Sequence, residues 1–174
     1  MATKPQKIFK VVVIGAAGVG KTSIVRRLCE NSFLEGYKTT IGSDFYVKKL
    51  DLDQALVNLS VWDLAGEERF KFIIPTFCKG AQGALIVFDL TRRRSYVSVT
   101  SFIELLWEHS GHIPSVLIGN KSDIPERAVT CEEAKKYADQ VRVGYYETSA
   151  KDNINIFKIF EELAFLMIRN QEPH

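Results

Sequence analysis

The sequence lacks the usual features of a secreted or membrane-spanning chain. Its three cysteines are far apart and lack metal-ligand spacing, so we expect free thiols in a reducing compartment. No apolar run approaches the ~20 residues that a membrane helix needs, and the polar first residues do not read as a signal peptide. The C-terminal residues contain no prenylation motif. We therefore expect a cytoplasmic protein without a membrane anchor of its own, which reaches a membrane only through a partner or a longer tail.

A strong charge of one sign is also absent. The chain has 23 lysines and arginines against 21 acidic residues, so its net charge is only +2 and no nucleic-acid partner is expected. Local basic clusters such as Arg92-Arg93-Arg94 are best explained as solvated faces. A length of 174 residues with 46% hydrophobic composition suits one domain with its own core. We expect residues 1–174 to form that single domain, with flexible ends at 1–6 and 171–174.

One glycine-rich stretch carries the strongest functional signal. Residues 15–22 read GAAGVGKT and match the phosphate-binding pattern G-x-x-x-x-G-K-[ST]. A β-branched apolar run of strand length precedes this stretch, and apolar residues at helical spacing follow it. Such a loop points successive N–H groups into one concavity at the start of a helix, where a polyphosphate binds. Lys21 can reach the β- and γ-phosphates, and the Thr22 hydroxyl can reach a bridging Mg²⁺.

The hydrophobic pattern of the whole chain alternates strands with helices after an initial hairpin. We expect strands at 7–14, 45–51, 56–64, 84–89, 116–119 and 144–147. We expect helices at 21–30, 95–109, 130 to about 140 and 153–169, and irregular segments at 31–43 and 65–76. This order predicts an α/β fold, a P-loop NTPase three-layer sandwich. Its six-stranded sheet should be mostly parallel with one antiparallel edge strand and helices on both faces.

Three further motifs follow predicted strands, so the carboxyl ends of the sheet should bring them to the glycine-rich loop. Asp63 is well placed to hold Mg²⁺, and the Gly66 N–H could approach a γ-phosphate. The stretch 120–123 reads NKSD, and the carboxylate of Asp123 can accept two hydrogen bonds from guanine. Adenine offers no such pair of donors on that edge, so guanine would be preferred. The stretch 149–151 also follows a strand but is uninformative alone.

Together these motifs resemble those of the Ras superfamily of small GTPases, and within it the Rab-like branch. The resemblance covers about residues 9–167 and implies GTP or GDP with Mg²⁺ as the cofactors. The residues that it implies for nucleotide contact are Ala17, Gly18, Val19, Gly20, Lys21, Thr22, Ser23, Phe33, Tyr37, Thr40, Gly66, Asn120, Lys121, Asp123, Ser149, Ala150 and Lys151. The implied metal ligands are Thr22, Thr40 and Asp63, and the implied catalytic residues are Lys21, Thr40, Gly66 and Glu67.

The resemblance also implies individual roles. Phe33 would lie against the guanine ring and Tyr37 would close over the phosphates. Thr40 would bind Mg²⁺ and the γ-phosphate only in the triphosphate state. Lys121 and Lys151 would flank the guanine ring.

The Rab-like assignment rests on the stretches 41–45, 62–63 and 68–70. Phe45, Trp62 and Phe77 match the aromatic triad through which that branch meets effectors, although ordinary core packing would also explain three aromatic residues. The branch further implies an exchange factor and a GTPase-activating protein as partners.

Glu67 is the largest departure from the family pattern, which usually has glutamine here to orient the attacking water. A carboxylate can only accept hydrogen bonds, and two unit charges ~4 Å apart repel by roughly 4 kcal/mol at an effective dielectric of ~20. The repulsion would favour a protonated carboxyl or push the side chain out. We predict slow hydrolysis, so that the chain stays triphosphate-bound unless a partner supplies catalysis. The alternatives are a solvated residue of little effect and a general base.

Two other features bear on catalysis that a partner would supply. Ala17 stands where many Ras-like proteins have glycine, and its side chain can crowd an incoming arginine, although Rab-like members commonly tolerate a side chain there. The first predicted switch loop, 31–43, contains no arginine, so an activating partner would have to supply one. One alternative function is a catalytically impaired, GTP-bound scaffold. Another is an ATPase or kinase that uses Arg92-Arg93-Arg94 as a phosphate-clamping lid, which the NKSD stretch argues against.

Overall fold

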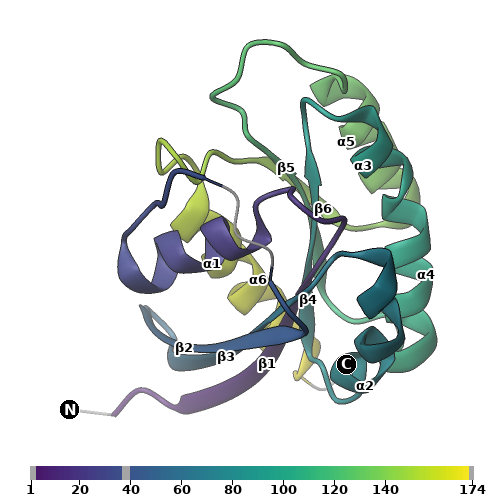
Figure 1. Ribbon diagram of the computed structural model, residues 1–174. Helices are drawn as coiled ribbons and strands as arrows, with labels where there is room; N and C mark the ends of the chain where they lie inside the picture. The colour runs from purple at the N-terminus through teal and green to yellow at the C-terminus, as the bar shows by residue number, and fades with distance from the viewer. Residues whose placement is uncertain (1–2, 37–39, 173–174) are drawn as a thin grey trace.

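The computed structural model describes residues 3–36 and 40–172. Over these residues six strands form one sheet in the order β2-β3-β1-β4-β5-β6 (Figure 1). They are β1 (Gln6–Ile14), β2 (Ser43–Leu52), β3 (Ala55–Leu64), β4 (Gly83–Asp89), β5 (Ser115–Asn120) and β6 (Gly144–Glu147). β2 runs antiparallel to β3, and the other neighbouring pairs are parallel. The predicted mostly parallel sheet with one antiparallel edge strand is therefore confirmed.

Helices cover both faces of the sheet, as the sequence predicts. They are α1 (Lys21–Glu30), α2 (Ile74–Cys78), α3 (Arg93–Val97), α4 (Val99–Ser110), α5 (Cys131–Val141) and α6 (Ile156–Asn170), with a 3₁₀ turn η1 (Glu68–Ile73) before α2. α1 and α6 pack on one face, whereas α2, α4 and α5 pack on the other (Figure 1). None of the helices in the described part of the chain is long and apolar enough to cross a membrane.

The central strand β1 shows how the two faces are built from one run of apolar residues. Val11 and Val13 pack toward α1 and α6, while Val12 and Ile14 pack toward α2 and α4. All four side chains are buried because successive residues of a strand point to opposite faces and both faces are covered. Two packed layers therefore fix the carboxyl end of β1, where the glycine-rich loop begins.

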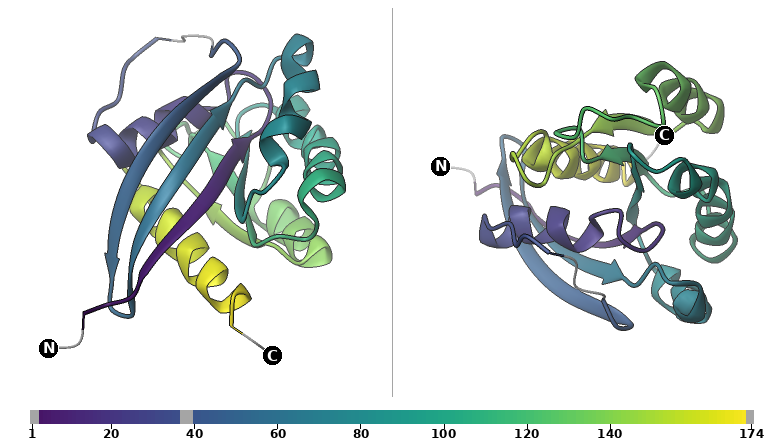
Figure 2. Two further views of the ribbon diagram at one scale, coloured as in Figure 1. Left: turned by 90° about the horizontal axis from the view of Figure 1, so that it is seen from below. Right: turned by 45° about the horizontal axis from the view of Figure 1, so that its top comes forward.

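At the end of the sheet opposite the glycine-rich loop, a hydrogen bond joins the start of β1 to the residue after α6. In the left view of Figure 2, the start of β1 (purple) and the end of α6 (yellow) both lie toward the lower end of the molecule. The Lys7 ammonium donates to the side-chain oxygen of Gln171 there, at 2.9 Å. Gln6, which we expected to belong to a flexible end, is the first residue of β1.

Three predicted elements differ from the structure. The segment 65–76 is not irregular throughout, because it contains η1 and the start of α2. The predicted helix 95–109 is divided at Ser98 into α3 and α4. Ser98 and Ser101 donate their hydroxyls to nearby backbone carbonyls, which competes with a continuous helix. The last helix begins at Ile156 rather than at 153, because Asn155 adopts a left-handed conformation.

The buried face of α6 is also narrower than the sequence pattern indicates. Ile156, Phe160, Leu163 and Met167 are buried, as expected. The hydrophobic pattern of 153–169 predicts Phe157 on the same face, but Phe157 is 51% exposed. A residue one position after Ile156 is rotated by about 100° around a helix, which turns Phe157 away from the sheet.

Candidate nucleotide-binding site

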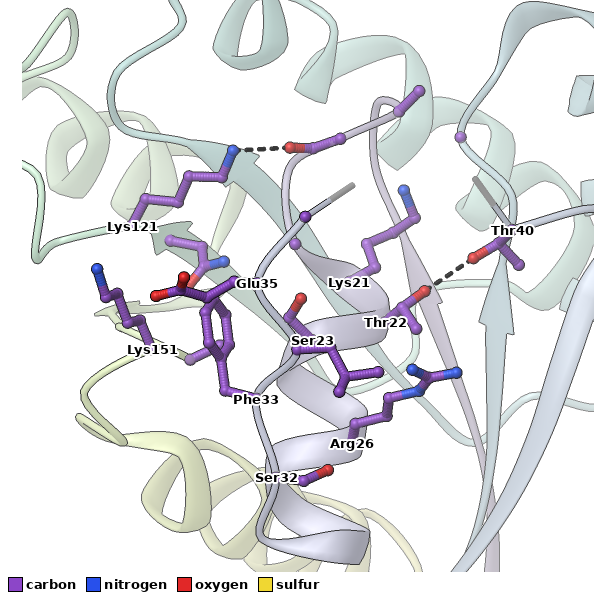
Figure 3. Close-up of a pocket in the computed structure, with 18 of the residues that line it drawn as sticks. Lys21, Thr22, Ser23, Arg26, Ser32, Phe33, Glu35, Thr40, Lys121 and Lys151 are labelled. Atoms are coloured by element: carbon purple, nitrogen blue, oxygen red, sulfur yellow. Dashed lines mark hydrogen bonds between the residues drawn. The ribbon is translucent and has the colours of Figure 1, made fainter. Parts of the chain in front are cut away.

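A cavity of about 530 Å³ lies at the carboxyl ends of the parallel strands (Figure 3). Its walls come from the loop after β1, the first turns of α1, the segment 32–36, Thr40, the segment 65–67, and the loops after β5 and β6. The predicted contact residues that line it are Ala17, Gly18, Gly20, Lys21, Thr22, Ser23, Phe33, Thr40, Gly66, Asn120, Lys121, Asp123, Ala150 and Lys151. The sheet therefore brings residues from distant parts of the sequence to one cavity.

Some predicted residues lie elsewhere. Val19 and Ser149 are fully buried behind the cavity wall, and Asp63 is fully buried beneath it. Tyr37 lies outside the described residues. The sequence prediction missed several wall residues, which are Arg26, Ser32, Leu34, Glu35, Gly36, Ala65 and Ile124. Helical spacing could have identified Arg26, because it lies one turn after Thr22 on α1.

Close backbone packing explains two of the glycines around the cavity. Gly20 has φ +100°, and a Cβ atom there would lie 2.2 Å from the side-chain nitrogen of Asn120. A Cβ atom on Gly66 would lie 2.2 Å from the carbonyl oxygen of Gly15. A side chain at either position would separate segments that now touch. The loop after β3 can therefore approach the loop after β1 only because residue 66 is glycine.

Lys21 fills the concavity of the glycine-rich loop. Its ammonium donates to the carbonyls of Gly15 and Ala16, at 2.9 and 2.8 Å. The side chain is only 6% exposed, and burial lowers the pKa of Lys21 to about 8, against the opposing effect of Asp63. Within the described residues no carboxylate lies within hydrogen-bonding distance of this buried ammonium, so its charge makes it a strong site for an anion.

Three oxygen groups converge beside Lys21. The Thr22 hydroxyl donates to Asp63 Oδ2 at 2.5 Å and lies 2.8 Å from the Thr40 hydroxyl (Figure 3). The second carboxylate oxygen of Asp63 is buried and has no hydrogen-bond partner among the described residues. Burial raises the pKa of Asp63 to about 6. A buried oxygen without a partner, next to two hydroxyls, fits Mg²⁺, which prefers oxygen ligands and keeps waters and phosphates as the others.

Hydrogen bonds fix the loops at the opposite end of the cavity. Asn120 is 2% exposed; its amide donates to the Val19 carbonyl at 3.0 Å and its oxygen accepts from Thr148 at 2.9 Å. Asp123 Oδ1 accepts from the Ser149 hydroxyl at 2.7 Å. The buried Ser149 thus orients the Asp123 carboxylate. A planar base with two adjacent donors would meet this carboxylate as an acceptor in a fixed position.

The side chains of Phe33, Lys121 and Lys151 line this end of the cavity, with the Glu35 side chain among them (Figure 3). The loop that carries Lys151 is held from α1, because Arg27 donates to the carbonyls of Ala150 and Lys151 at 2.8 and 2.9 Å. No sequence motif indicates this role of Arg27.

Glu67 lines the cavity near Gly66, but its carboxylate is paired. Oε2 accepts from the Arg69 Nε at 2.7 Å, and the side chains of Glu67 and Arg69 are 25% and 67% exposed. The Arg69 guanidinium also lies 4.7 Å from the centroid of the Phe70 ring. The sequence reasoning considered Glu67 only against a phosphate and missed this partner two residues away.

Phe45, Trp62 and Phe77 form a continuous row from β2 across β3 to α2. The ring centroids of Phe45 and Trp62 are 4.7 Å apart, and those of Trp62 and Phe77 are 5.1 Å apart. Phe45 is 50% exposed, whereas Trp62 and Phe77 are partly buried and pack against the core. Core packing therefore explains only part of the triad, and Phe45 is available to a partner.

Comparison with known proteins agrees with this geometry. A family model described as the Ras family matches residues 10–169. The GTP-binding protein yptV2 of Volvox carteri is 38% identical over 160 residues, which are 90% of this chain and 74% of that protein. The Ras-related protein RABD2a of Arabidopsis thaliana is 38% identical over 159 residues, covering 90% and 78%. The Ras-related protein Rab-21 of Bos taurus is 40% identical over 166 residues, covering 94% and 75%.

The fold is that of a Ras-like P-loop GTPase, and the chain belongs to the Ras family. Its similarity to Rab proteins over most of its length makes it a Rab-like member of the superfamily. The resemblance on which the sequence analysis relied is therefore confirmed.

Proposed function

We propose that this chain is a GTP/GDP-binding molecular switch of Rab type with slow intrinsic hydrolysis. The observation that carries the switch is the 2.8 Å approach of the Thr40 hydroxyl to the Thr22 hydroxyl. Thr22 belongs to α1, whereas Thr40 belongs to the loop between α1 and β2. A ligand bound at this point would hold that loop against α1, and its loss would release the loop. The name of the Volvox relative, a GTP-binding protein, supports the same function.

The phosphate end of the cavity would work mainly through the glycine-rich loop and Lys21. The pKa of about 8 leaves the Lys21 ammonium mostly charged at pH 7, and it would exchange the carbonyls of Gly15 and Ala16 for phosphate oxygens. Thr22, Thr40 and Asp63 would hold Mg²⁺, which when bound neutralises charge on the phosphates. The Gly66 N–H would meet the terminal phosphate and thereby hold the second switch segment.

The base end would select guanine. Asp123, oriented by Ser149, would accept from the two adjacent donors of the guanine edge. Phe33 and Lys151 would contact the faces of the ring, and the Ala150 N–H would meet the guanine oxygen. An adenine base would leave the partly buried carboxylate of Asp123 without its partners, which costs more than the loss of a fully exposed contact.

Glu67 would limit the rate of hydrolysis. A glutamine can accept from the attacking water and donate to the γ-phosphate, whereas a carboxylate can only accept. In addition, the Glu67 carboxylate is engaged by Arg69. This ion pair favours a second candidate function, a GTP-bound scaffold that binds effectors without efficient turnover.

We further propose protein partners of the Rab type. Effectors would bind the switch segments and the row formed by Phe45, Trp62 and Phe77, since exposed aromatic residues are strong interface anchors. An exchange factor and a GTPase-activating protein would set the nucleotide state. The protein would act in the cytoplasm in vesicle-mediated transport or signalling, and would reach membranes through a partner or a tail.

Nucleotide exchange on the purified protein tests the binding function. Labelled GTP bound in the presence of Mg²⁺ should be displaced by unlabelled GTP or GDP and should stay bound in a large excess of ATP. Equal displacement by ATP would contradict guanine selection and would favour the ATPase alternative. Chromatography of the nucleotide retained on purification tests turnover, because retained GTP indicates arrested or very slow hydrolysis, whereas retained GDP indicates a working hydrolase and argues against the scaffold.

A further inference from the structure

Three consecutive carbonyls of the glycine-rich loop accept hydrogen bonds from side chains outside the loop. The Ala17 carbonyl accepts from the Arg92 guanidinium at 2.6 Å. The Gly18 carbonyl accepts from the Lys121 ammonium at 2.9 Å, and the Val19 carbonyl from the Asn120 amide at 3.0 Å. Asn120 and Lys121 belong to the NKSD stretch that we expect to bind the base. Arg92 comes from a different loop, between β4 and α3.

These bonds fix the direction of the N–H groups on the opposite side of the loop. In a planar trans peptide unit, the carbonyl and the N–H of the next residue point in opposite directions. None of the peptide bonds in the described part of the chain is cis. Holding the Ala17 carbonyl outward therefore aims the Gly18 N–H inward. Gly18 lines the cavity, so its N–H becomes available to a phosphate.

Arg92 is itself held in place by the buried residue Asp89. The Asp89 carboxylate is 2.8 Å from the Lys121 ammonium and 3.7 Å from the Arg92 Nε. Burial alone would raise the pKa of Asp89. Hydrogen bonds from Lys121 and Thr91 outweigh burial and hold this pKa below its usual range. One buried carboxylate thus aligns the two cations that bond successive carbonyls of the loop.

The backbone of Arg92 is also fixed. Its N–H donates to the Asp89 carbonyl at 3.0 Å, and its carbonyl accepts from the Ser95 hydroxyl at 2.7 Å. The Leu90 N–H donates to the Asn120 carbonyl at 3.0 Å, which joins this loop to the base end of the cavity. The guanidinium therefore extends from a rigid support, and the bond to Ala17 requires little further ordering of the chain.

We propose that Arg92 is a positioning residue for the bound nucleotide, which orients the Ala17–Gly18 peptide unit and so slows nucleotide release. The inference rests on the proposed GTP/GDP binding. Arg92 bonds the loop backbone and is not among the residues that line the cavity, so its loss should affect GDP and GTP alike. Arg94, the third arginine of the basic triplet, is exposed and makes no side-chain hydrogen bond or ion pair within the described residues.

Dissociation of fluorescent GDP and GTP from the loaded, full-length protein tests this proposal. Arg92→Ala should release both nucleotides about tenfold faster, because a charge-assisted hydrogen bond is lost from a binding loop. Arg92→Lys can still donate to the Ala17 carbonyl and should stay within about twofold of the wild type. Arg94→Ala is the matched control and should leave both rates unchanged. The NMR signal of the Gly18 amide in the GDP complex should move in Arg92→Ala and stay in place in Arg94→Ala.

Two results would overturn the proposal in a protein that holds guanine nucleotide. One is release from Arg92→Ala at the wild-type rate. The other is failure of Arg92→Lys to restore slow release, because the effect would then not depend on donation to the carbonyl. A wild-type protein that binds no guanine nucleotide would instead contradict the proposed function itself, and the inference with it. Arg92 is half-exposed, so the alanine variant is expected to fold, which its circular dichroism and melting temperature check.

Discussion

The Glu67 carboxylate lies 2.7 Å from the Arg69 Nε, so the residue that departs from the family pattern carries its own counter-ion. The pair is partly exposed, with side-chain exposures of 25% and 67%, and such a pair contributes at most about 1 kcal/mol. It can therefore break when a partner or a phosphate offers either group a better contact. Arg69 lowers the repulsion that Glu67 would exert on a terminal phosphate. The Glu67 carboxylate still has no N–H group that could donate a hydrogen bond to that phosphate.

Substitution of Arg69 tests this electrostatic role. Arg69→Ala should lower the affinity for GTP relative to GDP by about threefold, because the unpaired carboxylate repels the additional phosphate. Binding titrations with both nucleotides measure the ratio. Lys71→Ala is the control, since Lys71 pairs with Glu68 instead. In the Glu67→Gln background, Arg69→Ala should leave the affinity for GTP relative to GDP unchanged. A threefold loss in that background as well would show that Arg69 acts without Glu67.

Asp63 should make nucleotide retention depend on Mg²⁺. In the wild type, removal of Mg²⁺ with EDTA should accelerate GDP release by about a hundredfold or more, since the metal joins the protein to the phosphates. Asp63→Asn should release GDP quickly even with Mg²⁺ present, and EDTA should change its rate little. Asp53→Asn, in the exposed turn between β2 and β3, should behave like the wild type. A strong EDTA response in Asp63→Asn would place the metal elsewhere.

The buried serine behind Asp123 should contribute to guanine affinity. Ser149→Ala removes the hydroxyl that donates to Asp123 Oδ1, and the freed carboxylate should bind GDP about fivefold to tenfold more weakly. Equilibrium binding of GDP measures the loss. The matched control is Ser122→Ala, because Ser122 neighbours Asp123 and its side chain makes no hydrogen bond within the described residues. Equal losses in the two variants would argue against an orienting role of Ser149.

The fold could be predicted from the sequence where the signal is local. The runs 84–88 in β4 and 116–118 in β5 are apolar because both faces of the sheet are covered, and such runs indicate buried parallel strands. The bounds of α1 agree with the prediction because the glycine-rich loop fixes its start. The motif order also indicates that residues 15–22, 66 and 120–123 meet at one edge of the sheet, because parallel strands bring their carboxyl ends together, and these segments do contribute to the wall of one cavity.

The remaining features depend on tertiary contacts that local patterns do not encode. The basic triplet at 92–94 contains three identical side chains, and only the packed loop shows that Arg92 reaches Ala17. The Glu67–Arg69 pair arises from the backbone turn before η1. The division between α3 and α4 depends on serine hydroxyls that compete with the helix, although the helical periodicity continues across it.

Single-turnover hydrolysis of GTP by the wild type and Glu67→Gln, measured between pH 6 and pH 8, tests the central claim most directly. We predict that the glutamine variant hydrolyses GTP at least about tenfold faster at every pH, because it alone can both accept from the water and donate to the γ-phosphate. Nucleotide affinity should be similar in the two proteins. A glutamine variant that is no faster than the wild type would contradict the claim that Glu67 slows hydrolysis.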